Sequence, residues 1–198
     1  MCLLACAFVR EELSSRGISP DAGDPPVLLP FGPLADGACA EALHRQAELF
    51  GLRLAEPLTP LDRPNRAEAG AAACEAMDLL EAAFLATRLG CRRVFWPASA
   101  GVGEGLDLDR IAEITDSALL VGRLVALRSS SHGMPGIHVH TPFADLTDRQ
   151  LAELVQDMAL PMQACWWWGG GGGTAGASEA RRWAGVLEPG RGISSGHA

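Results

Sequence analysis

The segment GVGEG at residues 101–105 has glycine at every second position. It lies between a predicted strand and a predicted helix, where backbone amides can bind a phosphate. The spacing lacks the last interval of the dinucleotide-binding fingerprint, and no acidic residue follows a further strand at the distance that this fingerprint requires. The pattern therefore favours a flexible loop. Because such a loop lies at the carboxyl ends of the strands, Gly101, Gly103 and Gly105 are the candidate cofactor-binding residues.

Two histidines and one cysteine have the chemistry of metal ligands. His138 and His140 are two residues apart on a predicted strand, so both side chains project from the same face. No carboxylate or cysteine stands at a matching position, which favours imidazoles on the sheet surface or in the core over a metal site. Cys165 is predicted to be a free, partly buried thiol, because the sequence places no histidine to activate it.

Four acidic residues at the start of a predicted helix could be imagined as magnesium ligands: Asp107, Asp109, Glu113 and Asp116. Asp107 instead suits a helix cap. The other three suit a solvated helix face, with favourable negative charge near the helix N-terminus. The sequence therefore identifies no catalytic residue.

Strand-like and helix-like segments alternate along the chain. The predicted strands cover residues 27–31, 52–58, 93–96 and 137–141, and the predicted helices cover 1–16, 36–50, 66–89 and 108–127, with another from residue 147 and a short one near 179–186. Strands that alternate with helices of this length predict right-handed crossovers and a parallel sheet covered on both faces. The predicted fold class is therefore α/β: a doubly wound parallel sheet in a single-domain, Rossmann-like α/β/α sandwich.

The stretch after the last predicted strand is the most informative part of the sequence. Pro142 ends the strand, and Thr147 with Gln150 forms a capping box that opens an amphipathic helix. The predicted buried stripe of that helix comprises Leu151, Leu154, Val155 and Met158. Three consecutive tryptophans at 166–168 cannot all face one core, so at least one should be exposed or cover a partner surface. A partner contact and packing over the sheet edge are equally compatible with this pattern.

Composition limits the function classes. The chain has 198 residues, of which 48% are hydrophobic and 20% charged, and this suits one domain with a sizeable core. A net charge of −8 without a basic stripe argues against nucleic-acid binding. The apolar residues 1–9 are too short for a membrane span and lack the basic region of a signal peptide. Six scattered cysteines without a CxxC pair predict buried thiols in a reducing cytoplasm.

One order of residues resembles a known enzyme family. The matching residues are Thr141 with Pro142, Asp145 to Thr147, Leu160 with Pro161, and Cys165. This order is similar to the C-terminal part of the 7-cyano-7-deazaguanine synthases of queuosine precursor synthesis. The resemblance implies a PP-loop ATPase fold, which is a Rossmann-like domain of the adenine-nucleotide-binding type, with ATP and zinc as the family's cofactors. Complete members use ATP to activate the carboxylate of 7-carboxy-7-deazaguanine and convert it with ammonia to the nitrile.

The chain departs from the family pattern at three motifs. The first strand and the SGGxDS loop, which binds the phosphates of ATP in the family, are absent from this sequence. Met77 and Asp78 stand in place of the arginine and asparagine of a P-x-R-N motif. The counterparts of three zinc-binding cysteines are Gly173, Gly176 and Glu179. Only Cys165 remains as a lone remnant of the metal site, beside the retained Arg182, so we expect neither ATP nor zinc as a cofactor.

The resemblance divides the chain into a PP-loop-type domain at residues 1–165 that lacks its first strand, a Trp/Gly-rich segment with a short helix at 166–188, and a disordered tail at 189–198. The leading hypothesis is a divergent synthase-like protein of the ATP-dependent ligase family with little or no activity. The alternative is a non-catalytic binding or partner subunit, a pseudoenzyme that associates with itself or with a complete synthase. A third hypothesis is an unrelated Rossmann-like nucleotide binder.

Overall fold

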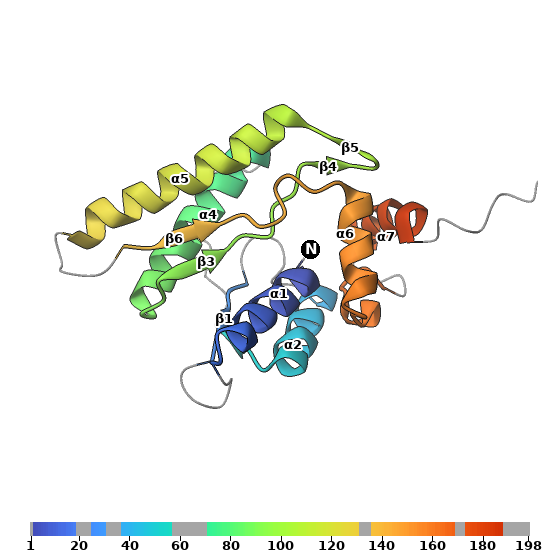
Figure 1. Ribbon diagram of the computed structural model, residues 1–198, viewed down its shortest axis with the longest axis horizontal. Coiled ribbons are helices and arrows are strands. Elements are labelled where there is room, and N and C mark those ends of the chain that lie inside the picture. Colours follow the sequence, from blue (N-terminus) through green and yellow to red (C-terminus); the bar gives the residue numbers. More distant parts are fainter. Residues whose placement is uncertain are drawn as a thin grey trace, which may run out of the picture.

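The computed structural model describes residues 2–18, 25–30, 37–56, 71–130, 136–168 and 173–187. Its helices are α1 (Cys2–Ser15), α2 (Ala38–Phe50), α4 (Ala71–Arg88), α5 (Leu108–Ser130), α6 (Asp148–Asp157) and α7 (Gly173–Leu187), with a short 3-10 helix η2 (Met162–Ala164). Its strands are β1 (Val27–Leu28), β2 (Arg53–Leu54), β3 (Arg93–Phe95), β4 (Gly101–Val102), β5 (Gly105–Leu106) and β6 (His138–His140). The protein is a mixed α/β structure, as predicted, in which long helices surround short strands (Figure 1).

Four of the strands form two parallel ladders. β1 pairs with β2, and β3 pairs with β6 in a register that places Val94 opposite Val139. Within the described part of the chain β1 and β3 are not paired, so the continuous four-stranded sheet expected from the sequence is not seen. Alternation of strands and helices predicts the direction of each strand but does not determine which strands become neighbours.

The predicted boundaries agree best for the longest elements. The helix predicted at 108–127 starts where α5 starts and ends three residues before it. The short helix predicted near 179–186 is longer in the structure, because α7 already begins at Gly173. Gly37 is the N-cap of α2 and supplies no side-chain hydrogen bond. Asp36, the first residue of the predicted helix at 36–50, lies outside the described residues, as do residues 57–58, 66–70 and the tail at 189–198.

The glycine-rich segment after β3 forms a hairpin instead of the predicted flexible loop. Gly101 pairs with Leu106, and Val102 with Gly105, across the antiparallel strands β4 and β5. Gly103 has a φ of 61°, a left-handed conformation that glycine adopts without strain and that permits the tight turn. The sequence did not predict this hairpin because glycine has a low intrinsic propensity for strands. Strand pairing also depends on the partner segment, which local propensity does not take into account.

Helices cover both faces of the β3–β6 ladder (Figure 1). On one face, α4 and α5 form a first core around the fully buried Ile114 and Val125, and Val94 of β3 packs against it. On the other face lies α1, whose Phe8 ring meets the Phe95 ring of β3 edge to face at a centroid distance of 6.0 Å. The ladder therefore has a helical layer on each side.

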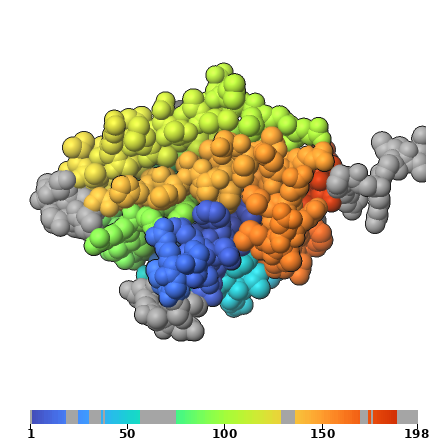
Figure 2. Space-filling view, viewed as in Figure 1, coloured from blue at the N-terminus to red at the C-terminus, as the bar shows by residue number. Residues whose placement is uncertain are grey.

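A second core joins the first and last described helices. Leu3 and Leu4 of α1 belong to the same buried cluster as Leu151 of α6 and Trp183 of α7. In Figure 2, the blue atoms of α1 lie against the orange atoms of the C-terminal region. The apolar residues at the start of the sequence therefore form part of the second core. None of the described helices is long and apolar enough to cross a membrane.

The three consecutive tryptophans have three different environments. Trp167 is buried in the second core, Trp166 is half-buried against it, and Trp168 is 50% exposed. The prediction that at least one of them is exposed is therefore confirmed. The C-terminal segment packs with α1 and α6, so it belongs to the same core as the first helix.

Helix α6 begins with the predicted capping box. Thr147 Oγ1 accepts a hydrogen bond from the backbone N–H of Gln150 at 3.1 Å, and Gln150 Oε1 accepts one from the backbone N–H of Thr147 at 2.9 Å. These bonds satisfy two amides that a helix start leaves without helical partners. Leu151 of the predicted stripe is fully buried, and Leu154, Val155 and Met158 pack against the second core.

Replacing Thr147 with alanine should lower the free energy of unfolding by about 1 kcal/mol, because one cap is lost. Urea denaturation followed by circular dichroism measures the change. Thr115→Ala is the matched control, because the Thr115 hydroxyl donates to Ile111 O within α5 and caps no helix start. Equal losses in the two variants would contradict the capping role of Thr147.

Candidate functional site

A cleft of about 370 Å³ opens beyond the carboxyl end of β3. It is lined by residues 99–103, by Asp107 and Arg110 at the start of α5, by Asp148 at the start of α6 and by Arg182 of α7. Open parallel sheets bind their ligands outside the carboxyl ends of the strands. The cleft is therefore the candidate functional site.

The segments that follow β3 and β6 run side by side and assemble this cleft. The backbone N–H of Trp96 donates to His140 O at 2.8 Å, and that of Ala100 donates to Ala144 O at 3.3 Å. The extension of β3 thereby carries the β4–β5 hairpin to the N-terminus of α6, where Asp148 is the first helical residue.

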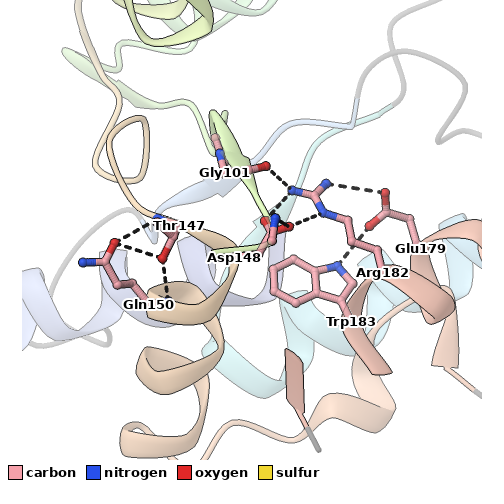
Figure 3. Close-up of polar contacts among 9 residues, drawn as sticks. Gly101, Thr147, Asp148, Gln150, Glu179, Arg182 and Trp183 are labelled. Atoms are coloured by element: carbon pink, nitrogen blue, oxygen red, sulfur yellow. Dashed lines mark hydrogen bonds and ion pairs between the residues drawn. The ribbon is translucent and has the colours of Figure 1, made fainter. Parts of the chain in front are cut away.

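Asp148 and Arg182 form an ion pair at this point (Figure 3). Asp148 is 1% exposed, and its Oδ1 and Oδ2 accept hydrogen bonds from Arg182 Nη2 at 2.5 Å and Arg182 Nε at 3.0 Å. Oδ2 also accepts from the backbone N–H of Gly103 at 3.1 Å, and Arg182 Nη2 donates to Gly101 O at 3.2 Å. Two side chains therefore tie the hairpin, α6 and α7 together.

Arg182 has a second acidic neighbour on its own helix. Arg182 Nη1 lies 3.8 Å from Glu179 Oε1, and Glu179 Oε2 accepts a hydrogen bond from Trp183 Nε1 at 3.0 Å (Figure 3). Hydrogen bonding to Asp148 is the main cause that raises the pKa of Arg182 above its ordinary value. A guanidinium that stays protonated can bind and orient anionic groups, but it cannot act as a proton donor in catalysis.

Arg110 and Asp107 supply the other charged groups of the cleft. Asp107 Oδ1 accepts from the backbone N–H of Arg110 at 3.1 Å, so the prediction of Asp107 as a helix cap is confirmed. The Arg110 side chain pairs with Glu113 at 2.8 Å and with Glu75 of α4. Partial burial acts to lower the pKa of Arg110, but hydrogen bonds to these two carboxylates outweigh it and raise the pKa. Two carboxylates and two guanidiniums thus line the cleft.

Gly101 is required for the close approach of the hairpin to α6. A Cβ atom at this position would lie 2.7 Å from Asp148 N and 2.9 Å from both Asp148 Oδ1 and Leu146 O. These separations are shorter than van der Waals contacts, and two of the three atoms belong to the backbone. Glycine is therefore needed at position 101 so that the hairpin can pack against the start of α6, and not to make room for a ligand.

The structure brings two of the three candidate cofactor-binding glycines to the cleft. Gly101 and Gly103 line it, whereas Gly105 lies in β5 outside the lining residues. The Gly103 N–H, which a phosphate would need, donates to the Asp148 carboxylate. The Asp148 carboxylate therefore takes the hydrogen bond that a bound phosphate would need, and its negative charge would repel a phosphate. This disfavours phosphate binding by the hairpin.

Cys165 is a buried member of the second core. Burial is the main cause that raises the pKa of this thiol, so it stays protonated near neutral pH. Of the positions that correspond to zinc ligands, Glu179 contacts Arg182 and Trp183 instead. The described residues contain no group of three or more His, Cys, Asp and Glu side chains that could hold a metal ion.

The two histidines of β6 lie on its surface. His138 and His140 are both exposed, and the His140 ring stacks on Phe95 at a centroid distance of 5.1 Å. Desolvation, followed by the charge of Arg93, lowers the pKa of His140. These contacts agree with the interpretation of both residues as sheet-surface imidazoles.

Sequence reasoning missed Asp148 and Arg110 as site residues. Asp148 directly follows the N-cap Thr147, where an acidic residue is expected simply as a favourable partner of the helix dipole. Arg110 likewise has the appearance of one member of a solvated helical face. The sequence signals that did point to the cleft were the glycine-rich segment with Gly101 and Gly103, and the retained Arg182 of the family motif.

A comparison with known protein families finds no match, and none of the curated proteins matches the sequence.

Proposed function

We propose that this chain is a divergent relative of the 7-cyano-7-deazaguanine synthases that binds a small polar ligand in the cleft and has little or no nitrile-forming activity. The observation that carries this proposal is the contact between Asp148 and Arg182. Asp148 directly follows the Asp145-to-Thr147 segment of the sequence resemblance, and Arg182 is the retained arginine of the family's C-terminal motif, so this contact brings two parts of the resemblance near each other at the carboxyl end of a parallel ladder.

The proposed Rossmann-like fold has support from the strand pairs. Both ladders are parallel, and helices cover both faces of the β3–β6 ladder. We propose that the two ladders are halves of one doubly wound sheet.

Several contacts favour binding over catalysis. The amide that could contact a phosphate is bonded to Asp148. Helix α7 is held in place by the Asp148–Arg182 pair and by the buried Trp183, at the position in the chain where the family uses zinc. Protein contacts therefore replace the metal in fixing the C-terminal segment.

The charges of the cleft define the class of ligand. A carboxylate such as Asp107 accepts hydrogen bonds from the amino and ring N–H groups of a guanine-like edge, and a guanidinium such as Arg110 donates to a carboxylate. A 7-deazaguanine that carries a carboxylate has both groups. The cleft volume of about 370 Å³ lies at the lower end of the range for small-molecule sites. We therefore propose a carboxylated deazapurine as the ligand.

Isothermal titration calorimetry with 7-carboxy-7-deazaguanine tests this proposal. We expect binding that Arg110→Gln weakens about tenfold or more, because a charge-assisted hydrogen bond is lost. Arg149→Gln is the matched control, since Arg149 pairs with Glu104 and Glu153 and does not line the cleft. The absence of binding by the wild-type protein would exclude this ligand.

The activity is tested separately with ATP, ammonia, zinc and the same deazapurine. We expect no ATP-dependent release of pyrophosphate or AMP and no zinc in the purified protein. Release that depends on the deazapurine would show that the chain is an active synthase and would contradict the non-catalytic assignment.

A partner subunit is the second candidate function. The exposed Trp168 favours it, because a large aromatic side chain that is half in water often contacts another protein. Copurification of a complete synthase by the wild-type protein, and its loss in Trp168→Ser, would distinguish this function from ligand binding alone.

A further inference from the structure

The outward face of α5 carries a stripe of exposed leucines. Ile114, Ala118, Val121 and Val125 turn toward the first core. On the opposite side, four leucines are 43–73% exposed: Leu119, Leu120, Leu124 and Leu127. Leu120, Leu124 and Leu127 are spaced by four and three residues, so they form one line along the helix. We name these three residues and the neighbouring Leu119 the leucine stripe. An apolar patch of this kind on an outer helix marks an interaction surface.

The stripe lies on a helix at the edge of the molecule. Figure 1 shows α5 along one long edge, with the β3–β6 ladder and the other helices to one side of it. Figure 2 shows the yellow and yellow-green atoms of α5 as the surface of that edge. The exposed leucines of the stripe are therefore accessible to a second molecule in the second half of the helix.

The charges on the same face are divided between the two halves of α5. Asp109, Glu113 and Asp116 are exposed in the first half, and Arg123 is exposed in the second half beside the leucines. One end of the face is therefore acidic and the other end contains a cation. Such a face is complementary to a reversed copy of itself.

We propose that the leucine stripe is the interface of a homodimer in which the α5 helices of two copies pack antiparallel. A two-fold axis between residues 119 and 120 places Asp116 of one copy opposite Arg123 of the second copy, twice. The same axis brings Leu119 and Leu120 of both copies together at the centre. A parallel arrangement would oppose acid to acid and arginine to arginine, which costs free energy. This interface depends on α5 alone and not on the ligand proposed above.

Sedimentation velocity across a dilution series tests the dimer. We expect wild-type protein with twice the chain mass of 20.8 kDa, and a dissociation constant about tenfold or more higher for Leu120→Gln. Leu49→Gln is the matched control, because Leu49 is 52% exposed on α2 and lies outside the stripe. A monomeric wild-type protein, or equal dissociation constants in the two variants, would overturn the proposal.

A charge reversal tests the antiparallel orientation. Asp116→Arg should weaken the dimer, because it faces Arg123 of the second copy, and the double variant Asp116→Arg/Arg123→Asp should restore it. Both residues are exposed on α5, so the fold is retained, and circular dichroism checks this. A double variant as weak as the single one would rule out the antiparallel arrangement.

Discussion

Asp148→Ala should lower the free energy of unfolding by about 2–3 kcal/mol. The substitution leaves the Gly103 N–H and the Arg182 guanidinium without the carboxylate that accepts their hydrogen bonds. Loss of one partner from a fully buried ion pair costs about 3–5 kcal/mol, but the Arg182 side chain is 36% exposed and can turn toward water, which reduces the cost. Urea denaturation, monitored by tryptophan fluorescence and circular dichroism, measures the change.

Three further variants isolate the ion pair as the cause. Asp157→Ala removes an exposed carboxylate from the end of the same helix and should change stability by less than about 0.5 kcal/mol. Arg182→Ala alone and in combination with Asp148→Ala complete a double-mutant cycle, in which we expect a coupling of about 1–3 kcal/mol. Losses that simply add in the double variant would show that the two side chains do not stabilise each other.

Gly101→Ala should destabilise the protein by about 3 kcal/mol, at the upper end of the usual cost of overpacking. The new methyl group would lie 2.7 Å from Asp148 N and 2.9 Å from Leu146 O, and backbone atoms cannot rotate away as a side chain can. The hairpin must therefore shift away from α6, which also lengthens the hydrogen bond from Gly103 to Asp148. The same denaturation measurement detects the loss.

Gly105→Ala provides the matched control in the same hairpin. A Cβ atom at Gly105 would lie 3.6 Å from Val102 O, an ordinary contact, so this substitution should be close to neutral or slightly stabilising. If Gly101→Ala proved as mild as Gly105→Ala, the close packing of the hairpin on α6 would be contradicted.

Local features of the fold could be predicted from the sequence. The capping box of Thr147 and Gln150, the buried side of α6 and the cap at Asp107 depend on residues a few positions apart, and all three are found in the structure. Long helices such as α5 could be predicted because apolar residues recur along them at helical spacing.

Features that depend on distant residues could not be predicted in this way. The Asp148–Arg182 pair joins positions 34 residues apart, and each residue has an ordinary local explanation. The pairing of strands failed for a related reason, because two-residue strands such as β1 carry too little pattern to specify a neighbour. The fate of each tryptophan likewise depends on α1 and α7 and not on its sequence neighbours.

The two cores have different consequences for the order of events during protein synthesis. All buried members of the first core lie between Leu79 and Ala144, so this core can close as soon as that continuous stretch has left the ribosome. The second core joins Leu3 of α1 to Trp183 of α7. Helix α1 is synthesised before the other described helices. It can complete its contacts only after α7 has emerged, so its apolar side chains are exposed to misassociation in the interval.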